Sequence, residues 1–159
     1  MKAYIKSIAL IISAILIISF MGVLVSCDNI NYTLRTDPEK IEDKTGKMPD
    51  EIKSEIQLAY YESNKEYCDS PKQVKGVCYG VFDDTYCLML TLPGVMYMDA
   101  TAYVDVAGYT FMFGSVSNTM DVYCNGKFYS LTEAYQNGIL DDAEIEELYN
   151  FYTETKWGK

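Results

Sequence analysis

Residues 74–94 have the sequence VKGVCYGVFDDTYCLMLTLPG, and this stretch decides the fold that we expect. Apolar side chains occupy every second position on both sides of Asp83-Asp84, and such alternation is typical of a half-buried β-strand. The two aspartates supply a turn and Pro93-Gly94 ends the second segment, so the stretch predicts two antiparallel strands. The alternating positions are Val77, Tyr79 and Val81 in the first segment and Tyr86, Leu88, Leu90 and Leu92 in the second.

Further strands are expected downstream of this hairpin, at residues 101–106, 109–114 and 119–124. Asn125-Gly126 is a strong signal for a two-residue hairpin turn, and it leads into a short strand at Lys127-Phe128-Tyr129. The predicted sheet is therefore an antiparallel meander of about five strands.

One helix is predicted before the sheet. It begins at Pro49-Asp50, with Asp50 as its N-cap, and runs to about Asn64. Its apolar residues fall on one stripe at helical spacing. They are Ile52, Ile56, Ala59 and Tyr60.

Two short helices are predicted after the sheet. Ser130 with Glu133 fits a capping box, and Gly138 is placed to end the first of them. Asp141 with Glu144 begins the second, whose apolar stripe is Ile145, Leu148, Tyr149 and Tyr152. One helix, a meander and two short helices together predict an α+β fold.

The N-terminus has the layout of an export signal, because Lys2 and Lys6 precede an apolar run over residues 8–25. The run ends in Leu24-Val25-Ser26-Cys27, which resembles the lipobox of bacterial lipoproteins. That resemblance implies a lipoprotein signal peptide at residues 1–26, and a Cys27 that is acylated and becomes the mature N-terminus. The alternative is an uncleaved signal anchor, because the run is long enough to span a bilayer.

Residues 27–47 are expected to form the lipidated cysteine and a flexible polar tether, because charged side chains dominate them and apolar periodicity is weak. Residues 48–159 are expected to form a single small α+β domain. Either interpretation of the N-terminus places this domain on the extracytoplasmic face of the cell membrane. The net charge of -10 opposes contact with anionic lipid, so the acyl chains on Cys27 are the expected membrane contact.

A second resemblance lies toward the C-terminus. The segments VAGYTF at 106–111, NGKFYSLTEAY at 125–135, GIL at 138–140 and DAEI at 142–145 resemble a pattern in small uncharacterised proteins of Firmicutes and related bacteria. No established activity is associated with that pattern. The resemblance supports a discrete domain and implies no mechanism.

Composition excludes several classes of function. The chain contains no histidine, which removes Ser-His-Asp and Cys-His catalysis and imidazole-ligated metals. Its 13 basic and 23 acidic side chains give no basic footprint for nucleic acid. No calcium-loop pattern is present either, so neither a metal nor a cofactor is expected.

Four cysteines remain once Cys27 is set aside, and they are Cys68, Cys78, Cys87 and Cys124. An even number in an exported domain permits disulfides, in three pairings that the sequence does not distinguish. Buried reduced thiols are an equally good interpretation, because cysteine is also a common small core residue. The absence of a C-x-x-C motif argues against zinc and against redox chemistry.

Acidic residues are the plentiful catalytic material, and a pair of carboxylates in a cleft could hydrolyse glycosidic bonds. The candidates near strand ends are Asp83, Asp84, Asp99, Asp105 and Asp121. No spacing among them specifies a pair, so solubilising surface carboxylates are the simpler interpretation.

The chain has 15 tyrosines, and an exposed row of them in the strand region could bind a protein or stack on sugars. The candidates for this face are Tyr79, Tyr86, Tyr103, Tyr109, Tyr123 and Tyr129. Tyrosine also suits half-buried sheet faces without any ligand.

The main hypothesis is a membrane-anchored, non-enzymatic lipoprotein whose domain binds an envelope or extracellular protein, or a glycan, through this tyrosine face. The first alternative is a carboxylate-dependent hydrolase that acts on polysaccharide. The second is a structural or assembly factor with no ligand of its own.

Overall fold

The computed structural model describes residues 36–98 and 100–157. The expected signal peptide at residues 1–26, the lipidation site Cys27 and the first part of the expected tether lie outside the described residues, as does Asp99.

A five-stranded sheet with the order β1-β2-β3-β6-β7 forms the centre of the fold. Its strands are β1 (Ile41–Asp43), β2 (Lys75–Phe82), β3 (Thr85–Thr91), β6 (Asp121–Cys124) and β7 (Lys127–Ser130). The pairs β2-β3, β3-β6 and β6-β7 are antiparallel, whereas β1 lies parallel to β2. Together with the helices this confirms the predicted α+β class.

The predicted continuous meander is wrong at its middle. Strands β4 (Ala102–Val106) and β5 (Tyr109–Phe113) form a separate two-stranded sheet, and β3 pairs directly with β6 instead. The hairpin packs Val106, Phe111 and Phe113 into a core on one face of the main sheet. Burial of these side chains therefore outweighs the backbone pairing that a meander would give.

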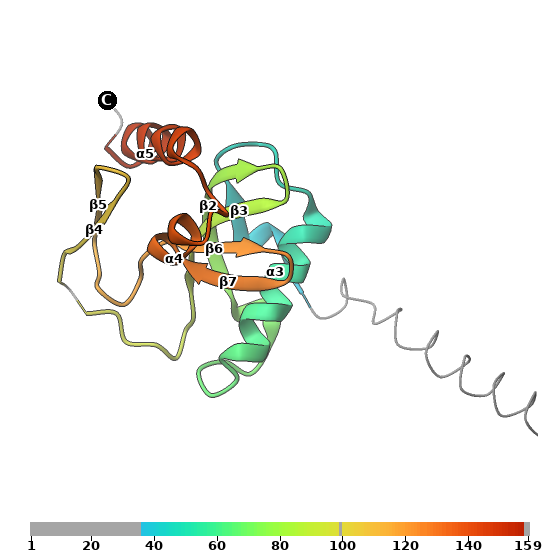
Figure 1. Ribbon diagram of the computed structural model, residues 1–159. Helices are drawn as coiled ribbons and strands as arrows, with labels where there is room; N and C mark the ends of the chain where they lie inside the picture. Colours follow the sequence, from blue (N-terminus) through green and yellow to red (C-terminus); the bar gives the residue numbers. More distant parts are fainter. Residues whose placement is uncertain (1–35, 99, 158–159) are drawn as a thin grey trace, which may run out of the picture. The chain divides into compact units, whose positions relative to one another are not determined.

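Helix α3 (Asp50–Ser63) lies on one side of the main sheet and the helices α4 (Leu131–Gln136) and α5 (Asp142–Trp157) lie on the other (Figure 1), and each face carries its own hydrophobic core. Helix α3 covers one face and contributes Ile56 to a core with Leu88 and Leu90. The opposite face carries the β4-β5 hairpin and the helices α4 and α5. Neither face of the five-stranded sheet is left open.

A β-bulge in β2 changes which residues face each core. Cys78 pairs with Leu88 and Gly80 pairs with Cys87, so Tyr79 is the extra residue. Tyr79 consequently packs on the α5 side while Val81 packs on the α3 side. The predicted alternation of Tyr79 and Val81 along one face is therefore wrong.

The folded domain begins before residue 48, where the sequence analysis placed its start. Gln57 of α3 is fully buried; its amide group donates to the carbonyls of Asp37 (2.8 Å) and Val74 (2.9 Å), and its oxygen accepts from the Asp37 amide. Residues 36–47, including η1 (Pro38–Lys40) and β1, are thus attached to the core rather than part of a tether.

The predicted starts of α4 and α5 and the predicted end of α3 near Asn64 are confirmed, with Asp141 and Glu144 bonded reciprocally at the start of α5, whereas the predicted N-cap of α3 is wrong. Ser130 and Glu133 form the capping box of α4, and Gly138 follows that helix with a φ of +67°. Helix α3 has Pro49 in the cap position, and Asp50 is its first residue, paired with Lys53 at 2.9 Å. The Asp50 side chain does not cap the helix, because the N-cap position, where the backbone is still extended, is occupied by Pro49. The last helix, α5, is 16 residues long rather than short.

Candidate functional site

The six tyrosines expected to form a binding face do not share one face. Tyr86 and Tyr123 are buried in the core under α3, at 6% and 3% exposure. The residues Tyr79, Tyr109 and Tyr129 pack against the core on the opposite side. Tyr103 on β4 is 65% exposed. The expected row is absent because helices and a hairpin cover both faces of the sheet.

The candidate carboxylates are dispersed as well. Asp83 and Asp84 form the β2-β3 turn, and Asp105 on β4 accepts a hydrogen bond from the Thr110 hydroxyl at 2.6 Å. Asp121 lies opposite Leu88, whereas Asp84 lies in the turn before Thr85, the residue that pairs with Cys124 at the other end of β6. The two aspartates therefore lie toward opposite ends of the β3-β6 pairing.

The four remaining cysteines are free thiols in the structure, and Cys68, Cys78 and Cys87 are buried. Cys78 faces the core under α3, whereas Cys87 faces the core under α5. The sheet therefore lies between these two sulfurs. Burial raises the pKa of the Cys78 thiol to about 12 and that of Cys87 well above its usual value, so both are poor nucleophiles.

One cleft brings together two of the predicted tyrosines and one predicted carboxylate. We call it the acidic cleft, and its volume is about 160 Å³. It lies where the first half of α3 meets the β2-β3 and β6-β7 turns. Its lining residues are Ile52, Glu55, Asp84, Tyr86, Tyr123, Asn125 and Gly126.

The sheet register builds this cleft. Tyr86 on β3 and Tyr123 on β6 are direct cross-strand partners, so their rings leave the sheet side by side toward α3. The adjacent turn has positive φ at Asn125 (50°) and at Gly126 (75°), as a type I′ hairpin requires. The predicted Asn-Gly hairpin is confirmed, and it forms one wall of the cleft.

Some polar groups of the acidic cleft form hydrogen bonds within the domain and others do not. The Tyr123 hydroxyl donates to Glu55 Oε1 at 2.6 Å, which fixes the glutamate against the sheet. The Tyr86 hydroxyl has no hydrogen-bond partner among the described residues, although only 6% of Tyr86 is exposed. Burial raises the pKa of Tyr86, and the charges of Asp84 and Glu55 add to this effect, so both carboxylates lie near its ring.

Sequence reasoning missed Glu55 and treated Asn125 only as a turn residue. Glu55 is separated from Tyr123 by 68 positions, and a glutamate on the polar side of a helix has no local feature that marks it as functional. The alternation that predicts β3 could place Tyr86 on one face. It could not show which helix would cover that face.

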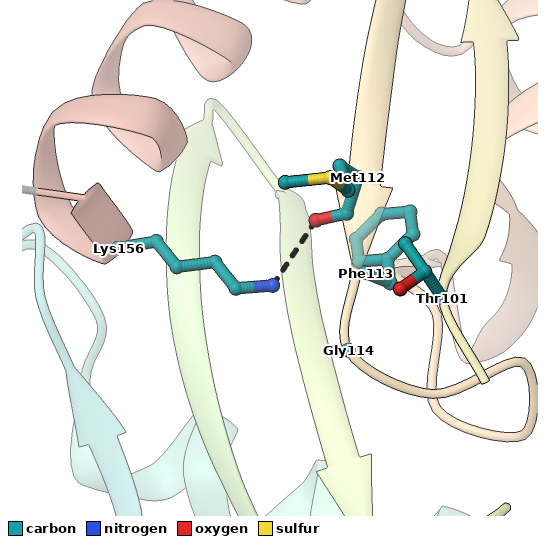
Figure 2. Close-up of a pocket in the computed structure, with 5 residues that line it drawn as sticks. All are labelled: Thr101, Met112, Phe113, Gly114 and Lys156. Atoms are coloured by element: carbon teal, nitrogen blue, oxygen red, sulfur yellow. Dashed lines mark hydrogen bonds between the residues drawn. The ribbon is translucent and has the colours of Figure 1, made fainter. Parts of the chain in front are cut away.

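A smaller pocket lies at the end of α5, lined by Thr101, Met112, Phe113, Gly114 and Lys156. Figure 2 shows the Lys156 side chain extending from the helix to the Met112 carbonyl, to which it donates at 3.1 Å. Burial lowers the pKa of Lys156, and its ammonium group also donates to the Tyr152 hydroxyl. The volume of about 70 Å³ has room for about two waters, so we assign Lys156 a structural role.

Asp121 lies outside both pockets and is half-buried. Its carboxylate forms no hydrogen bond or ion pair with another described residue, and burial raises its pKa from 3.8 to about 6. It adds to the elevated pKa of the Tyr60 hydroxyl on α3, whose main cause is burial. Asp121 is therefore a half-buried acid without a carboxylate partner among the described residues.

Within residues 36–98 and 100–157, no group of three or more acidic or cysteine side chains is placed to hold a metal ion. Over the same ranges, no helix combines the length and the hydropathy needed to cross a membrane. No protein-family model, curated protein or solved structure matches the chain.

Proposed function

We propose that this chain is an extracytoplasmic lipoprotein, anchored in the membrane through acyl chains on Cys27, whose folded domain binds a protein partner without catalysing a reaction. The anchor rests on the resemblance of Leu24-Val25-Ser26-Cys27 to a lipobox. The binding role rests on the acidic cleft, where the Asp84 carboxylate and the Tyr86 hydroxyl form no hydrogen bond with another described residue.

The observation that carries the binding role is the Tyr86 hydroxyl. The Tyr86 ring is buried, its hydroxyl opens into the cleft, and no described residue hydrogen-bonds to that hydroxyl. Tyr86 lines the acidic cleft beside Glu55 and Asp84, which can bind an external group. A ligand group with several donors could contact all three residues at once.

Crosslinking in the native host tests the binding role. A photo-crosslinking residue at Asn125 lies on the cleft wall, and the same residue at Asp105 on the exposed side of β4 is the matched control. We expect a discrete crosslinked protein from position 125 and none of that size from position 105. Equal products from the two positions, or no product from either, would contradict a partner that docks at the cleft.

Metabolic labelling with a palmitate analogue tests the anchor. The wild-type chain should incorporate the label and fractionate with membranes, and Cys27→Ser should lose the label. A labelled Cys27→Ser chain would show that the lipid is attached elsewhere.

A carboxylate-dependent hydrolase is the second candidate, because Glu55 and Asp84 line one cleft. Two features count against it. The volume of about 160 Å³ is smaller than the roughly 300–1,000 Å³ of typical ligand sites, and Glu55 is already engaged by Tyr123. Release of reducing ends from envelope polysaccharide by the wild-type chain, abolished in Glu55→Gln, would replace the binding proposal.

A further inference from the structure

The acidic cleft holds two carboxylates without a counter-ion. No basic side chain lines it, and neither Glu55 nor Asp84 forms an ion pair with another residue in the described part of the chain. The ion pairs within the described part of the chain lie outside the cleft. They are Asp37–Lys40, Glu42–Lys44, Asp50–Lys53 and Glu62–Lys65. Two like charges facing one small concavity repel each other, and a cation placed between them removes that repulsion.

The Tyr86 hydroxyl is a further polar group that opens into the cleft without a hydrogen bond from a described residue. Only 6% of Tyr86 is exposed, and the residue lines the cleft. Its oxygen has no partner among the described residues, while the neighbouring Tyr123 hydroxyl is bonded to Glu55. A third acceptor therefore faces the same space as the two carboxylates.

We propose that the acidic cleft binds the ammonium or guanidinium group of a lysine or arginine side chain that a protein partner presents. This inference rests on the proposed binding function and names the chemistry of its site. An ammonium group has three donors and no acceptor, which matches two carboxylates and one unbonded phenol oxygen. Ile52 supplies an apolar wall for the aliphatic stem of the side chain.

The size of the cleft favours one side chain over larger ligands. Its volume of about 160 Å³ lies below the roughly 300–1,000 Å³ of sites that enclose a whole small molecule. A saccharide unit also brings hydroxyl groups that need donors, and the lining offers mainly acceptors. The net charge of -10 further attracts a basic partner at low ionic strength.

A metal ion fits the cleft less well. Calcium takes six to eight oxygen ligands, and the cleft presents the carboxylates of Glu55 and Asp84 with the side-chain oxygen of Asn125. One Glu55 oxygen already accepts from Tyr123. These groups are too few to enclose a calcium ion but sufficient for an ammonium group.

Chemical-shift titration of the ¹⁵N-labelled full-length chain in mild detergent micelles tests the proposal. The probe is Nα-acetyl-lysine methylamide, and its neutral analogue Nα-acetyl-norleucine methylamide is the ligand control. We expect the lysine probe to shift the amide signals of Glu55, Asn125 and Gly126 in a saturable manner that weakens with added salt. Equal shifts with the norleucine probe, or none with the lysine probe, would overturn the proposal.

Substitutions then locate the site. Glu55→Gln keeps an oxygen for Tyr123 and Asp84→Asn keeps a turn-forming side chain, and each should weaken binding about tenfold. Tyr86→Phe removes a hydroxyl that has no partner, so it should weaken binding about threefold and leave the fold intact. Asp105→Asn, on exposed β4, is the matched charge control and should change nothing.

The remaining outcomes separate this inference from the proposed function. Calcium or N-acetylglucosamine that shifts the same signals more strongly than the lysine probe would overturn the cationic ligand. A crosslinked partner at position 125 that persists in the double variant Glu55→Gln, Asp84→Asn would preserve the binding function and refute the lysine or arginine chemistry. Polysaccharide hydrolysis at the cleft would refute both.

Discussion

Replacing Asp121 with asparagine should stabilise this protein at neutral pH. The carboxyl lies on β6 opposite Leu88 and Ser130, and it forms no hydrogen bond or ion pair with another described residue. Burial raises its pKa from 3.8 to about 6, and each unit corresponds to about 1.4 kcal/mol. The ionised side chain therefore costs the folded state about 3 kcal/mol.

The sign of the pH dependence follows from this shift. The folded state holds the proton more tightly than the unfolded state, so protonation of Asp121 stabilises the fold. That contribution is complete below pH 3.8 and is lost as the pH rises through about 6. Asp121→Asn has no such proton, and the desolvation of its amide reduces the gain at pH 8 to between about 1 and 3 kcal/mol.

Urea unfolding of the full-length chain in mild detergent, at several pH values between 4 and 8, measures the difference between wild type and Asp121→Asn. The difference should be close to zero near pH 4 and should grow in favour of the variant up to pH 8. The exposed Asp105→Asn serves as the control and should show no comparable growth. A variant that is less stable at pH 8, or a difference that does not change with pH, would refute the reasoning.

Three further predictions concern packing and the thiols. A Cβ at Gly94 would lie 2.3 Å from the Tyr67 carbonyl oxygen, so Gly94→Ala should destabilise the fold by about 1–3 kcal/mol, and an unchanged urea midpoint would contradict this. Gln57→Leu removes the bonds that attach residues 36–40, so it should destabilise by about 2–4 kcal/mol and expose that segment to protease; equal cleavage in both chains would show that the attachment is unimportant. Cys124, which is half-buried, should react with iodoacetamide before Cys87 in the native chain, and simultaneous reaction would contradict the buried position of Cys87.

Local sequence signals predicted most of the secondary structure. The β2-β3 pair, the Asn125-Gly126 hairpin and the α4 capping box depend on residues that are close in sequence, and all three are confirmed. Each of them follows from local backbone and hydrogen-bonding preferences. These local preferences do not depend on the tertiary contacts of the rest of the chain.

Long-range contacts account for what the sequence analysis missed. The separation of β4-β5 depends on which core receives Phe111 and Phe113, and a strand pattern does not contain that information. The bulge at Tyr79 shifts the faces of β2 by one residue, and the neighbouring Gly80 is its local sign in the sequence. Gln57 shows the same limitation, because its buried amide bonds to Asp37, which is 20 positions away.

The candidate site was harder to predict than the fold. Tyr86 and Tyr123 line one cleft, but the face expected to unite them with four other tyrosines is absent from the structure. The cleft instead joins them to Glu55, Asp84 and the hairpin turn, through the packing of α3 on the sheet. A function can be proposed for these residues because the two carboxylates form no ion pair with another described residue and the Tyr86 hydroxyl forms no hydrogen bond with one.

Intermolecular NOEs between the full-length chain and Nα-acetyl-lysine methylamide test the central claim most directly, because they locate the bound side chain. The account predicts NOEs from the ε-methylene protons of the probe to the Ile52 methyl groups and to the Tyr86 ring, lost in the double variant Glu55→Gln, Asp84→Asn. NOEs to the exposed side chains of Met96 or Met98 in place of the cleft, or none at saturating probe, would contradict it.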